Sequence, residues 1–402
     1  MAKSFLMINS SMNNSSWLLL VLFFFIVASS LKGSEAAVYN VLSYGAKPDG
    51  RADSTLAFQR AWLSACGSAM PATVYVPRGN FMLRPVVFSG PCKARIVFQV
   101  AGTLIAPSNY WSLGNSGYWI LFIKVTGVRV YGGTLNAQGS GYWACKSSGK
   151  SCPGGARSIS FQWSSNVVIS GITSVNSQMF HIVIDNCVNV LVRNVKIRAP
   201  AQSPNTDGIH IRSSTGVTIA SSSIMTGDDC ISIGPGSKNI WIQRIVCGPG
   251  HGISVGSLGE DANEDGVQNV TVTGAVFKGT QNGVRIKSWG RPSNGFARTI
   301  SFRNILMKNV FNPIIIDQNY CPDNSNCPNQ NSGVKISRVT YKNIRGTSAT
   351  PVAMNFACSP TNPCWGIALQ NIELTYLTTQ ATSYCKNAGG SSSGIVVPRS
   401  CF

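Results

Sequence analysis

The sequence is poor in acidic side chains and in histidine. Its 402 residues include 14 Asp and Glu and three His against 33 Lys and Arg, so the formal net charge is +19. A basic surface of this size implies an anionic partner, such as a nucleic acid, an acidic polysaccharide or an anionic lipid. Charged residues make up only 12% of the chain and hydrophobic residues 44%. This balance excludes a disordered chain, because disordered sequences are apolar-poor and charge-rich.

Long apolar runs are also missing, except for one near the N-terminus. Because this run is the only candidate, a protein with several membrane spans is excluded. The run extends from Trp17 to Ala28 and is too short to span a bilayer comfortably. A polar leader precedes it and small residues follow, so residues 1–36 are predicted to be a secretory signal peptide that ends near Ser34-Glu35-Ala36. An uncleaved anchor is the alternative. Cleavage would remove two Lys and one Glu, which leaves 31 basic and 13 acidic residues, a net charge of +18.

The 13 Cys residues form no Cys-x-x-Cys motif and no Cys/His cluster, which argues against a zinc site. In a secreted chain they fit a set of disulfides. Proximity along the chain suggests six pairs, although sequence alone does not determine connectivity: Cys66 with Cys92, Cys145 with Cys152, Cys230 with Cys247, Cys321 with Cys327, Cys358 with Cys364, and Cys385 with Cys401. Cys187 is left over and is expected to pack inside as a small apolar residue. Asn269 lies in the one glycosylation sequon beyond the signal region.

Helical periodicity is nearly absent, and a strand pattern recurs instead. The exception is Asp53 to Cys66, an amphipathic segment with an Asp/Ser N-cap. A pattern of roughly Asn/Gly-x-Val/Ile-x-x-x-Ile begins at residues 166, 189, 216, 239, 269, 299 and 366, and five-residue strands lie between these segments, at 181, 208, 230, 252, 283 and 313. Repeats built from short strands predict a solenoid or a propeller.

No Trp-Asp or kelch-like signature recurs, so the repeats favour an all-β, right-handed parallel β-helix. The helix near residue 60 would cap its N-terminal end. Residues 37–402 are predicted to be a single domain, since no linker or shift in composition divides them. An ordinary β-sandwich is the alternative.

The repeat spacing brings polar side chains into one column. Asp207, Asp229 and His251 each precede a five-residue strand, and the two intervals between them are both 22 residues. Consecutive rungs of a parallel stack lie about 4.8 Å apart, so these three residues should form a ladder with Asp228 beside it. In the next strand, GVRIK, alternation turns Arg285 and Lys287 to the outside, on the same face as His210.

Carboxylates packed this closely need a chemical reason in so basic a chain. Stacked Asp residues can be a solvated ladder, but like charges one rung apart raise one pKa at a cost in stability. Glycoside hydrolysis uses such a set, because one acid protonates the leaving oxygen while other carboxylates orient water. The cluster therefore indicates a glycosidase.

Four segments resemble the signature blocks of the polygalacturonases, glycoside hydrolase family 28. They are SPNTDGI (203–209), GDDC (227–230), CGPGHGIS (247–254) and RIKSW (285–289), and they occur in the family's order and spacing. The likeness covers about residues 38–376 or beyond, and VYNVLSYGAKPDG near the start resembles the plant members. The resemblance implies a parallel β-helix, in agreement with the repeats.

The resemblance also implies a role for each residue of the cluster. Asp207 and Asp229 would activate water, and Asp228 would be the general acid. His251 would maintain the protonation and hydrogen-bond geometry of that acid. An inverting mechanism and no metal or organic cofactor are implied. Endo action is expected over exo action, but the residues alone do not distinguish the two.

The same resemblance implies how the substrate is bound. Arg285 and Lys287 would hold the galacturonate carboxylate next to the scissile bond, and Tyr320 and Asn205 would contact substrate. The expected partner is an acidic polysaccharide, pectin or polygalacturonate, with no nucleic acid and no membrane after signal cleavage. The protein is expected to be a monomer that is secreted to the extracellular space or cell wall.

Other functions remain as alternatives. A pectate lyase has a similar β-helix but needs a Ca²⁺ cluster and an Arg base in place of these blocks. A rhamnogalacturonan-cleaving relative and a non-catalytic pectin-binding wall protein are closer alternatives. Nucleic-acid binding would explain the charge, but the chain lacks interleaved aromatic and basic motifs.

Overall fold

A computed structural model describes residues 36–322 and 325–402, and Ala37–Phe402 form one compact unit. The predicted signal peptide lies outside the described residues, apart from Ala36. Within the described part, no helix has both the length and the apolar character needed to cross a membrane.

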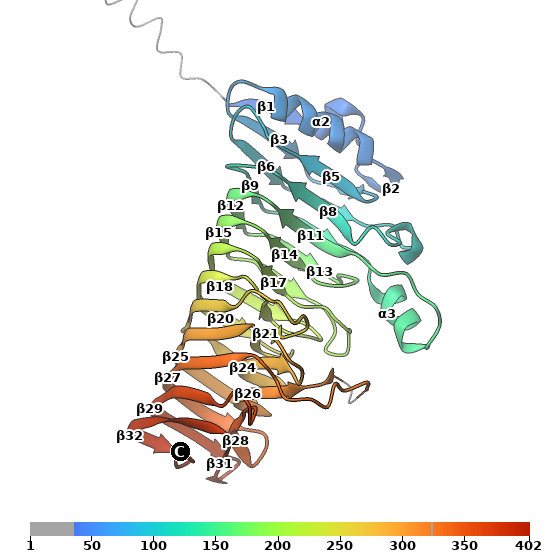
Figure 1. Ribbon diagram of the computed structural model, residues 1–402. Coiled ribbons are helices and arrows are strands. Elements are labelled where there is room, and N and C mark those ends of the chain that lie inside the picture. The colour runs from blue at the N-terminus through green and yellow to red at the C-terminus, as the bar shows by residue number, and fades with distance from the viewer. Residues whose placement is uncertain (1–35, 323–324) are drawn as a thin grey trace, which may run out of the picture. The chain divides into compact units, whose positions relative to one another are not determined.

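The unit is built from two long sheets whose strands stack in parallel, and Figure 1 shows this stack running from the N-terminal end to the C-terminus. The 11-stranded sheet consists of β5 (Val86–Ser89), β8 (Tyr118–Ile123), β11 (Arg157–Gln162), β14 (Ile182–Asp185), β17 (Ile209–Arg212), β19 (Ile231–Ile233), β21 (Ile253–Leu258), β24 (Asn282–Trp289), β26 (Asn312–Tyr320), β28 (Val352–Ala357) and β31 (Thr382–Lys386).

The second sheet has 21 strands, and among the described pairings only β29 with β30 is antiparallel. Its strands are β1 (Ala37–Asn40), β2 (Asp49–Asp53), β3 (Ala72–Val76), β4 (Asn80–Met82), β6 (Ile96–Val100), β7 (Thr103–Ile105), β9 (Arg129–Tyr131), β10 (Thr134–Asn136), β12 (Ser165–Ser170), β13 (Thr173–Val175), β15 (Val188–Arg193), β16 (Lys196–Arg198), β18 (Thr215–Met225), β20 (Lys238–Cys247), β22 (Val267–Thr273), β23 (Val276–Lys278), β25 (Phe296–Val310), β27 (Lys335–Ser348), β29 (Cys364–Tyr376), β30 (Thr379–Gln380) and β32 (Ala388–Val397). The chain alternates between the two sheets, so the predicted right-handed parallel β-helix is confirmed.

The core lies between the sheets and is filled by the inward residue of each alternating pair. Ile209, Ile231 and Ile253 are register partners on consecutive rungs, and all three are fully buried. Aromatic side chains stack in the same way, as Phe122 and Phe161 do with centroids 5.0 Å apart. Every β-branched strand of the repeat therefore buries one face in a continuous core.

The Asn that begins many repeats occupies a turn in the left-handed backbone region. Asn239 and Asn269 have φ of 56°, and the Asn269 side-chain amide donates to the Asn239 side-chain oxygen at 2.6 Å. Asn tolerates this conformation better than other non-glycine residues do, and stacked turns let its amides bond along the ladder. This explains the recurring Asn, and it places the amide of the predicted glycosylation site, Asn269, in a hydrogen bond.

Helix α2 (Thr55–Gly67) covers the N-terminal end of the stack, as predicted (Figure 1). Its buried Trp62 packs on Phe88 at 5.2 Å between centroids. Ser54 precedes the helix but makes no side-chain cap bond, and the Asp53 carboxylate instead accepts the Thr55 amide at 2.9 Å.

Three further helical segments were not predicted. They are α3 (Ser140–Ser147) and the two 3₁₀ turns η1 (Val41–Tyr44) and η2 (Tyr110–Ser112). The α3 sequence, SGYWACKS, is too short and too rich in Gly and Ser to show a helical period. The Cys145–Cys152 bridge ties this segment to the loop that follows it.

All six predicted disulfides are present, and Cys187 is unpaired and buried as predicted. Burial raises the pKa of the Cys187 thiol to about 11. This thiol is therefore a neutral core side chain at physiological pH.

Candidate active site

The predicted ladder of polar residues lies at the N-terminal ends of β17, β19 and β21. Asp207, Asp229 and His251 each stand two residues before the register partners of these strands. The main chain connects the rungs, since the Gly208 amide donates to the Asp229 carbonyl at 2.9 Å. The equal spacing in the sequence thus corresponds to one column in space.

Asp229 is a fully buried carboxylate held by two cations. Its oxygens accept from Arg285 Nη2 at 2.8 Å and from Lys287 Nζ at 2.9 Å, and Ser254 Oγ adds a third bond at 2.7 Å. Burial opposes ionisation, but Lys287 and Arg285 more than offset it and lower the pKa of Asp229 to about 2. Asp229 is therefore an anion at neutral pH.

Arg285 and Lys287 lie on the outer face of their strand, as alternation predicts, but they do not project into solvent. Each is only 7% exposed, because both lie against Asp229 and beside Tyr320. The prediction placed them on an open surface, and that part was wrong. Buried cations require a buried anion, and Asp229 provides it.

Asp207 has the opposite electrostatic environment. Burial, together with the charges of Asp228 and Asp229, raises its pKa well above the ordinary value. Its Oδ2 accepts from Ser232 Oγ at 2.6 Å, and the same hydroxyl lies 2.8 Å from His210 Nδ1. Because Ser232 donates to Asp207, it accepts from His210.

His210 is a neutral member of this chain of hydrogen bonds. Burial and the cations Arg157, Arg212 and Lys287 lower its pKa to about 4. The Phe180 ring packs against it, with centroids 4.8 Å apart.

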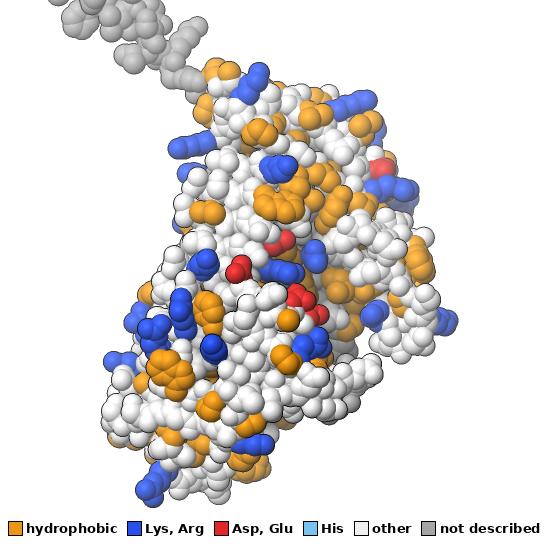
Figure 2. Space-filling model, in the orientation of Figure 1, with side chains coloured by type: hydrophobic (Ala, Val, Ile, Leu, Met, Phe, Trp, Pro, Cys, Tyr) orange, Lys and Arg blue, Asp and Glu red, His pale blue; other side chains and the backbone are white. Residues whose placement is uncertain are grey.

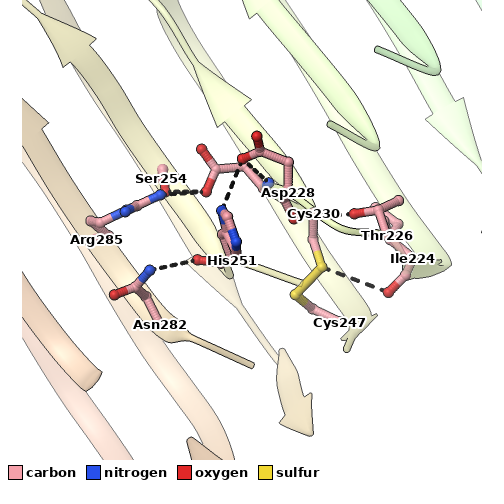
Figure 3. The surroundings of a disulfide bond; sticks show 10 residues. Ile224, Thr226, Asp228, Cys230, Cys247, His251, Ser254, Asn282 and Arg285 are labelled. Atoms are coloured by element: carbon pink, nitrogen blue, oxygen red, sulfur yellow. Dashed lines mark hydrogen bonds and ion pairs between the residues drawn. A yellow bond between two sulfur atoms is a disulfide. The ribbon is translucent and has the colours of Figure 1, made fainter. Parts of the chain in front are cut away.

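Asp228 is the more accessible member of the Asp228–Asp229 pair. Its Oδ1 lies 3.1 Å from His251 Nδ1 and also accepts the Asp229 amide at 2.7 Å, so its side chain turns toward His251 (Figure 3). Gly227, directly before Asp228, leaves no room for a side chain, because a Cβ there would clash with the Ser203 carbonyl oxygen.

The disulfide Cys230–Cys247 supports this arrangement from below (Figure 3). Cys230 follows Asp229 directly, and Cys247 is the last residue of β20, before the loop that leads to His251. The bridge therefore joins the rung that carries the two carboxylates to the segment that positions the histidine.

Tyr320 and Asn205 are placed differently. Tyr320 lies in the cluster, with its ring centroid 4.8 Å from Lys287 Nζ, and it is the register partner of Trp289. Asn205 is exposed in the turn before Asp207, with φ of 53°, and among the described residues its side chain makes no hydrogen bond.

Two serines contribute that the sequence interpretation missed. Ser232 and Ser254 bond Asp207 and Asp229, respectively. Both occupy the register column that runs from His210 through to Arg285. The sequence carries a signal for both, because each is the outward residue of its strand at the position that His210 and Arg285 occupy in theirs.

One group in the site has the spacing of metal ligands. Ligand atoms of Asp228, Asp229 and His251 lie within 4.8 Å of one another. However, both Asp229 oxygens already bind cationic side chains. Their positive charge opposes a metal ion here, so the group fits proton transfer better than coordination.

The chain is similar to known glycoside hydrolases over most of its length. The model of glycosyl hydrolases family 28 matches residues 66–398. A polygalacturonase from Prunus persica is 57% identical over 366 residues, 90% of this chain and 93% of that protein. An exopolygalacturonase from Platanus acerifolia is 43% identical over 371 residues, 91% of this chain and 98% of that protein.

Solved structures resemble the fold over most of its length. An endo-xylogalacturonan hydrolase from Aspergillus tubingensis matches with a TM-score of 0.78 and 25% identity, covering 89% of this chain and 99% of that one. A polygalacturonase from Erwinia carotovora matches with a TM-score of 0.69 and 26% identity, covering 89% and 97%. The chain belongs to glycosyl hydrolases family 28.

Proposed function

We propose that the protein is a polygalacturonase that hydrolyses α-1,4 linkages between galacturonic acid residues of pectin. The observation that carries this proposal is the contrast between neighbouring carboxyl groups. Asp229 is a buried anion bound by Arg285 and Lys287, whereas Asp228 is partly exposed beside His251. Such a set can supply a proton on one side of a bond and an oriented water on the other.

In the proposed reaction Asp228 donates its proton to the glycosidic oxygen while the bond from that oxygen to the anomeric carbon breaks. A water molecule held by Asp207 and Asp229 attacks the anomeric carbon and transfers a proton to Asp207. The raised pKa of Asp207 suits it to accept this proton, and the low pKa of Asp229 suits it to orient the water as an anion. His251 maintains the hydrogen-bond geometry of Asp228.

The same cluster is proposed to recognise the acidic sugar. Arg285 and Lys287 carry two positive charges against the single charge of Asp229, which leaves one positive charge for a galacturonate carboxylate. The Tyr320 ring beside Lys287 borders this position, and Asn205 is proposed to contact substrate from the turn before Asp207.

The remaining proposals concern where and how the protein acts. Residues 1–36 are proposed as a secretory signal, and residues 37–402 as one catalytic domain that works as a monomer in the extracellular space or cell wall. The six disulfides support an oxidising compartment. Endo action is proposed over exo action.

Digestion of defined oligogalacturonates tests the activity. We expect new reducing ends without an unsaturated product, and a ladder of intermediate lengths for endo action. An unsaturated product would indicate a lyase and contradict the proposal. Cleavage only of rhamnogalacturonan or xylogalacturonan would assign the activity to another substrate, and binding without cleavage would indicate a wall-binding protein.

A further inference from the structure

The positive charge of the protein is concentrated away from the active site, on the 21-stranded sheet. The described strands β6–β32 of this sheet carry fourteen Lys and Arg and a single carboxylate, Glu373. The cations are Arg129, Arg193, Lys196, Arg198, Lys238, Arg244, Lys278, Arg298, Arg303, Lys308, Lys335, Arg338, Lys342 and Arg345. All are exposed except Arg303, which is half-buried.

This distribution differs from an ordinary protein surface. Soluble domains usually intersperse both signs of charge, and a field of one sign is the arrangement that attracts an oppositely charged partner. In Figure 2, Lys and Arg side chains are spread widely over the face in view, whereas most of its few Asp and Glu lie near the middle. The strands of the 11-stranded sheet are more balanced, with the cations Arg157, Arg212, Arg285, Lys287 and Lys386 and the carboxylates Asp185 and Asp317.

A groove of about 780 Å³ lies on the 21-stranded sheet. Its floor is formed by four register partners on neighbouring strands, Arg129, Val168, Leu191 and Thr218. Neighbouring strands lie about 4.8 Å apart, so the three spacings between them give the floor a length of about 14 Å. Lys93 and Arg95 border the same groove. Its described lining residues therefore include three cations and no carboxylate.

An aromatic side chain continues the column beyond the groove. Trp241 is the register partner of Thr218 and is 38% exposed, and the Arg303 guanidinium lies 5.3 Å from its ring centroid. The indole offers a broad apolar surface, and the C–H faces of a sugar ring are complementary to it. Cations in line with an exposed indole suit a ligand that is both anionic and carbohydrate.

We propose that this strip binds a second stretch of the galacturonate polymer, apart from the segment in the active site. We call the strip the cationic groove and define it by its residues, Lys93, Arg95, Arg129, Val168, Leu191, Thr218 and Trp241. Its identification with galacturonate rests on the proposed function, because that function names the polyanion the protein meets. The groove would anchor the protein to its polymeric substrate while hydrolysis proceeds elsewhere.

A binding experiment in a hydrolysis-deficient background tests the proposal. The full mature chain carrying Asp228→Asn is titrated with polygalacturonate at low salt, with and without Lys93→Glu/Arg129→Glu. The matched control is Lys47→Glu/Arg60→Glu, which changes the net charge equally at two exposed positions outside the 21-stranded sheet. We expect the groove variant to raise the Kd about tenfold and the control about twofold or less.

Two further measurements separate the groove from general charge. Trp241→Ala should weaken binding of polygalacturonate and leave binding of poly-L-glutamate unchanged, because only the sugar offers a face to the indole. In the active protein, the groove variants should leave kcat/KM for trigalacturonate unchanged.

Several results would overturn the proposal. Equal losses in the groove and control variants would show that binding follows net charge alone, and no loss in either would show that the groove is not used. A larger loss for duplex DNA than for polygalacturonate would make the ligand a nucleic acid. If the wild-type protein bound polygalacturonate through the groove but did not cleave it, the proposed activity would be wrong and the proposed binding site would still hold.

Discussion

At the scale of single residues, the site separates three neighbouring carboxyl groups by their surroundings. Asp229 is stabilised as an anion by Lys287 and Arg285, whereas Asp207 is buried beside two other carboxyls. Ionisation of Asp207 therefore costs stability in the folded state, whereas ionisation of Asp229 is required by its cationic neighbours.

The same isosteric substitution should have opposite effects at these two positions. Asp229→Asn leaves two buried cations without their anion and is expected to lower the free energy of unfolding by about 3–5 kcal/mol. Asp207 has a raised folded-state pKa, so its contribution is full below the unfolded value of about 3.9 and is lost as pH rises through the folded value. Asp207→Asn should therefore stabilise the protein at neutral pH and much less near pH 4.

Urea unfolding of both variants at the two pH values measures this difference. A destabilised Asp207→Asn at neutral pH would contradict the electrostatic assignment of the cluster.

Ser232 should set the acidic limb of the activity profile. Asp207 must be ionised to accept a proton from water, and the hydrogen bond from Ser232 favours its ionised form. Ser232→Ala removes that bond, so the acidic limb of kcat/KM should move to higher pH, with about a tenfold loss on that limb. The matched control is Ser214→Ala, because Ser214 is buried but bonds only main-chain groups.

Rates across the pH range for both serine variants provide the test. An unchanged limb in Ser232→Ala, or an equal shift in Ser214→Ala, would separate Ser232 from the titration of Asp207.

The roles proposed for the three carboxyls also predict the stereochemistry. A water held by Asp207 and Asp229, across the sugar from Asp228, leads to inversion. The prediction rests on these roles and not on spacing, because ligand atoms of Asp228 and Asp229 lie within 4.8 Å of each other, closer than the about 6.5–9.5 Å typical of inverting pairs. Asp228→Asn should reduce kcat by about 10²–10⁴ with little change in binding, because it removes a proton donor and not a contact. Proton NMR of the first product decides the outcome. An initial α-anomer from the α-linked polymer would mean retention.

At the scale of the elements, the strands were predictable and the details between them less so. The interval of 22 residues places Asp207, Asp229 and His251 in one column because rungs of equal length repeat the same geometry. Alternation gives the outward direction of Arg285, but not its burial, which depends on a carboxylate 56 residues earlier in the chain. The short helix α3 has too few residues to show a period.

The asparagine ladders should stabilise the turns that join these strands. Asn343 has φ of 52°, donates to Asn304 at 3.0 Å and accepts from Asn371 at 3.2 Å. Asn343→Ala loses both bonds and must hold a left-handed conformation, so we expect a loss of about 2–3 kcal/mol. Asn343→Gly loses the bonds alone and should cost about 1 kcal/mol less. Equal losses by chemical denaturation would show that the backbone conformation contributes nothing.

At the scale of the whole molecule, composition revealed the excess of positive charge but not its position. The excess became a candidate binding surface only when the fold assigned fourteen cations to strands β6–β32 of one sheet and brought Arg129 and Trp241 into a single column. Register along a solenoid is a long-range property. It depends on every turn length between the two residues. The repeats that begin at residues 166 and 239 already align Val168 with Trp241, but Arg129 lies before the first repeat, so the repeats alone do not place it in this column.

The charge should make substrate capture depend on salt and on polymer length. Raising salt from about 0.01 M to about 0.15 M shortens the Debye length from about 30 Å to about 8 Å, which screens the exposed cations and affects the buried Arg285 and Lys287 much less. KM for polygalacturonate should therefore rise with salt while kcat changes little. KM for trigalacturonate, which carries far fewer negative charges than the polymer, should rise much less. Initial rates on both substrates across the salt range measure the difference. If KM rose equally with salt for both substrates, the cations of the 21-stranded sheet would take no part in capturing the polymer.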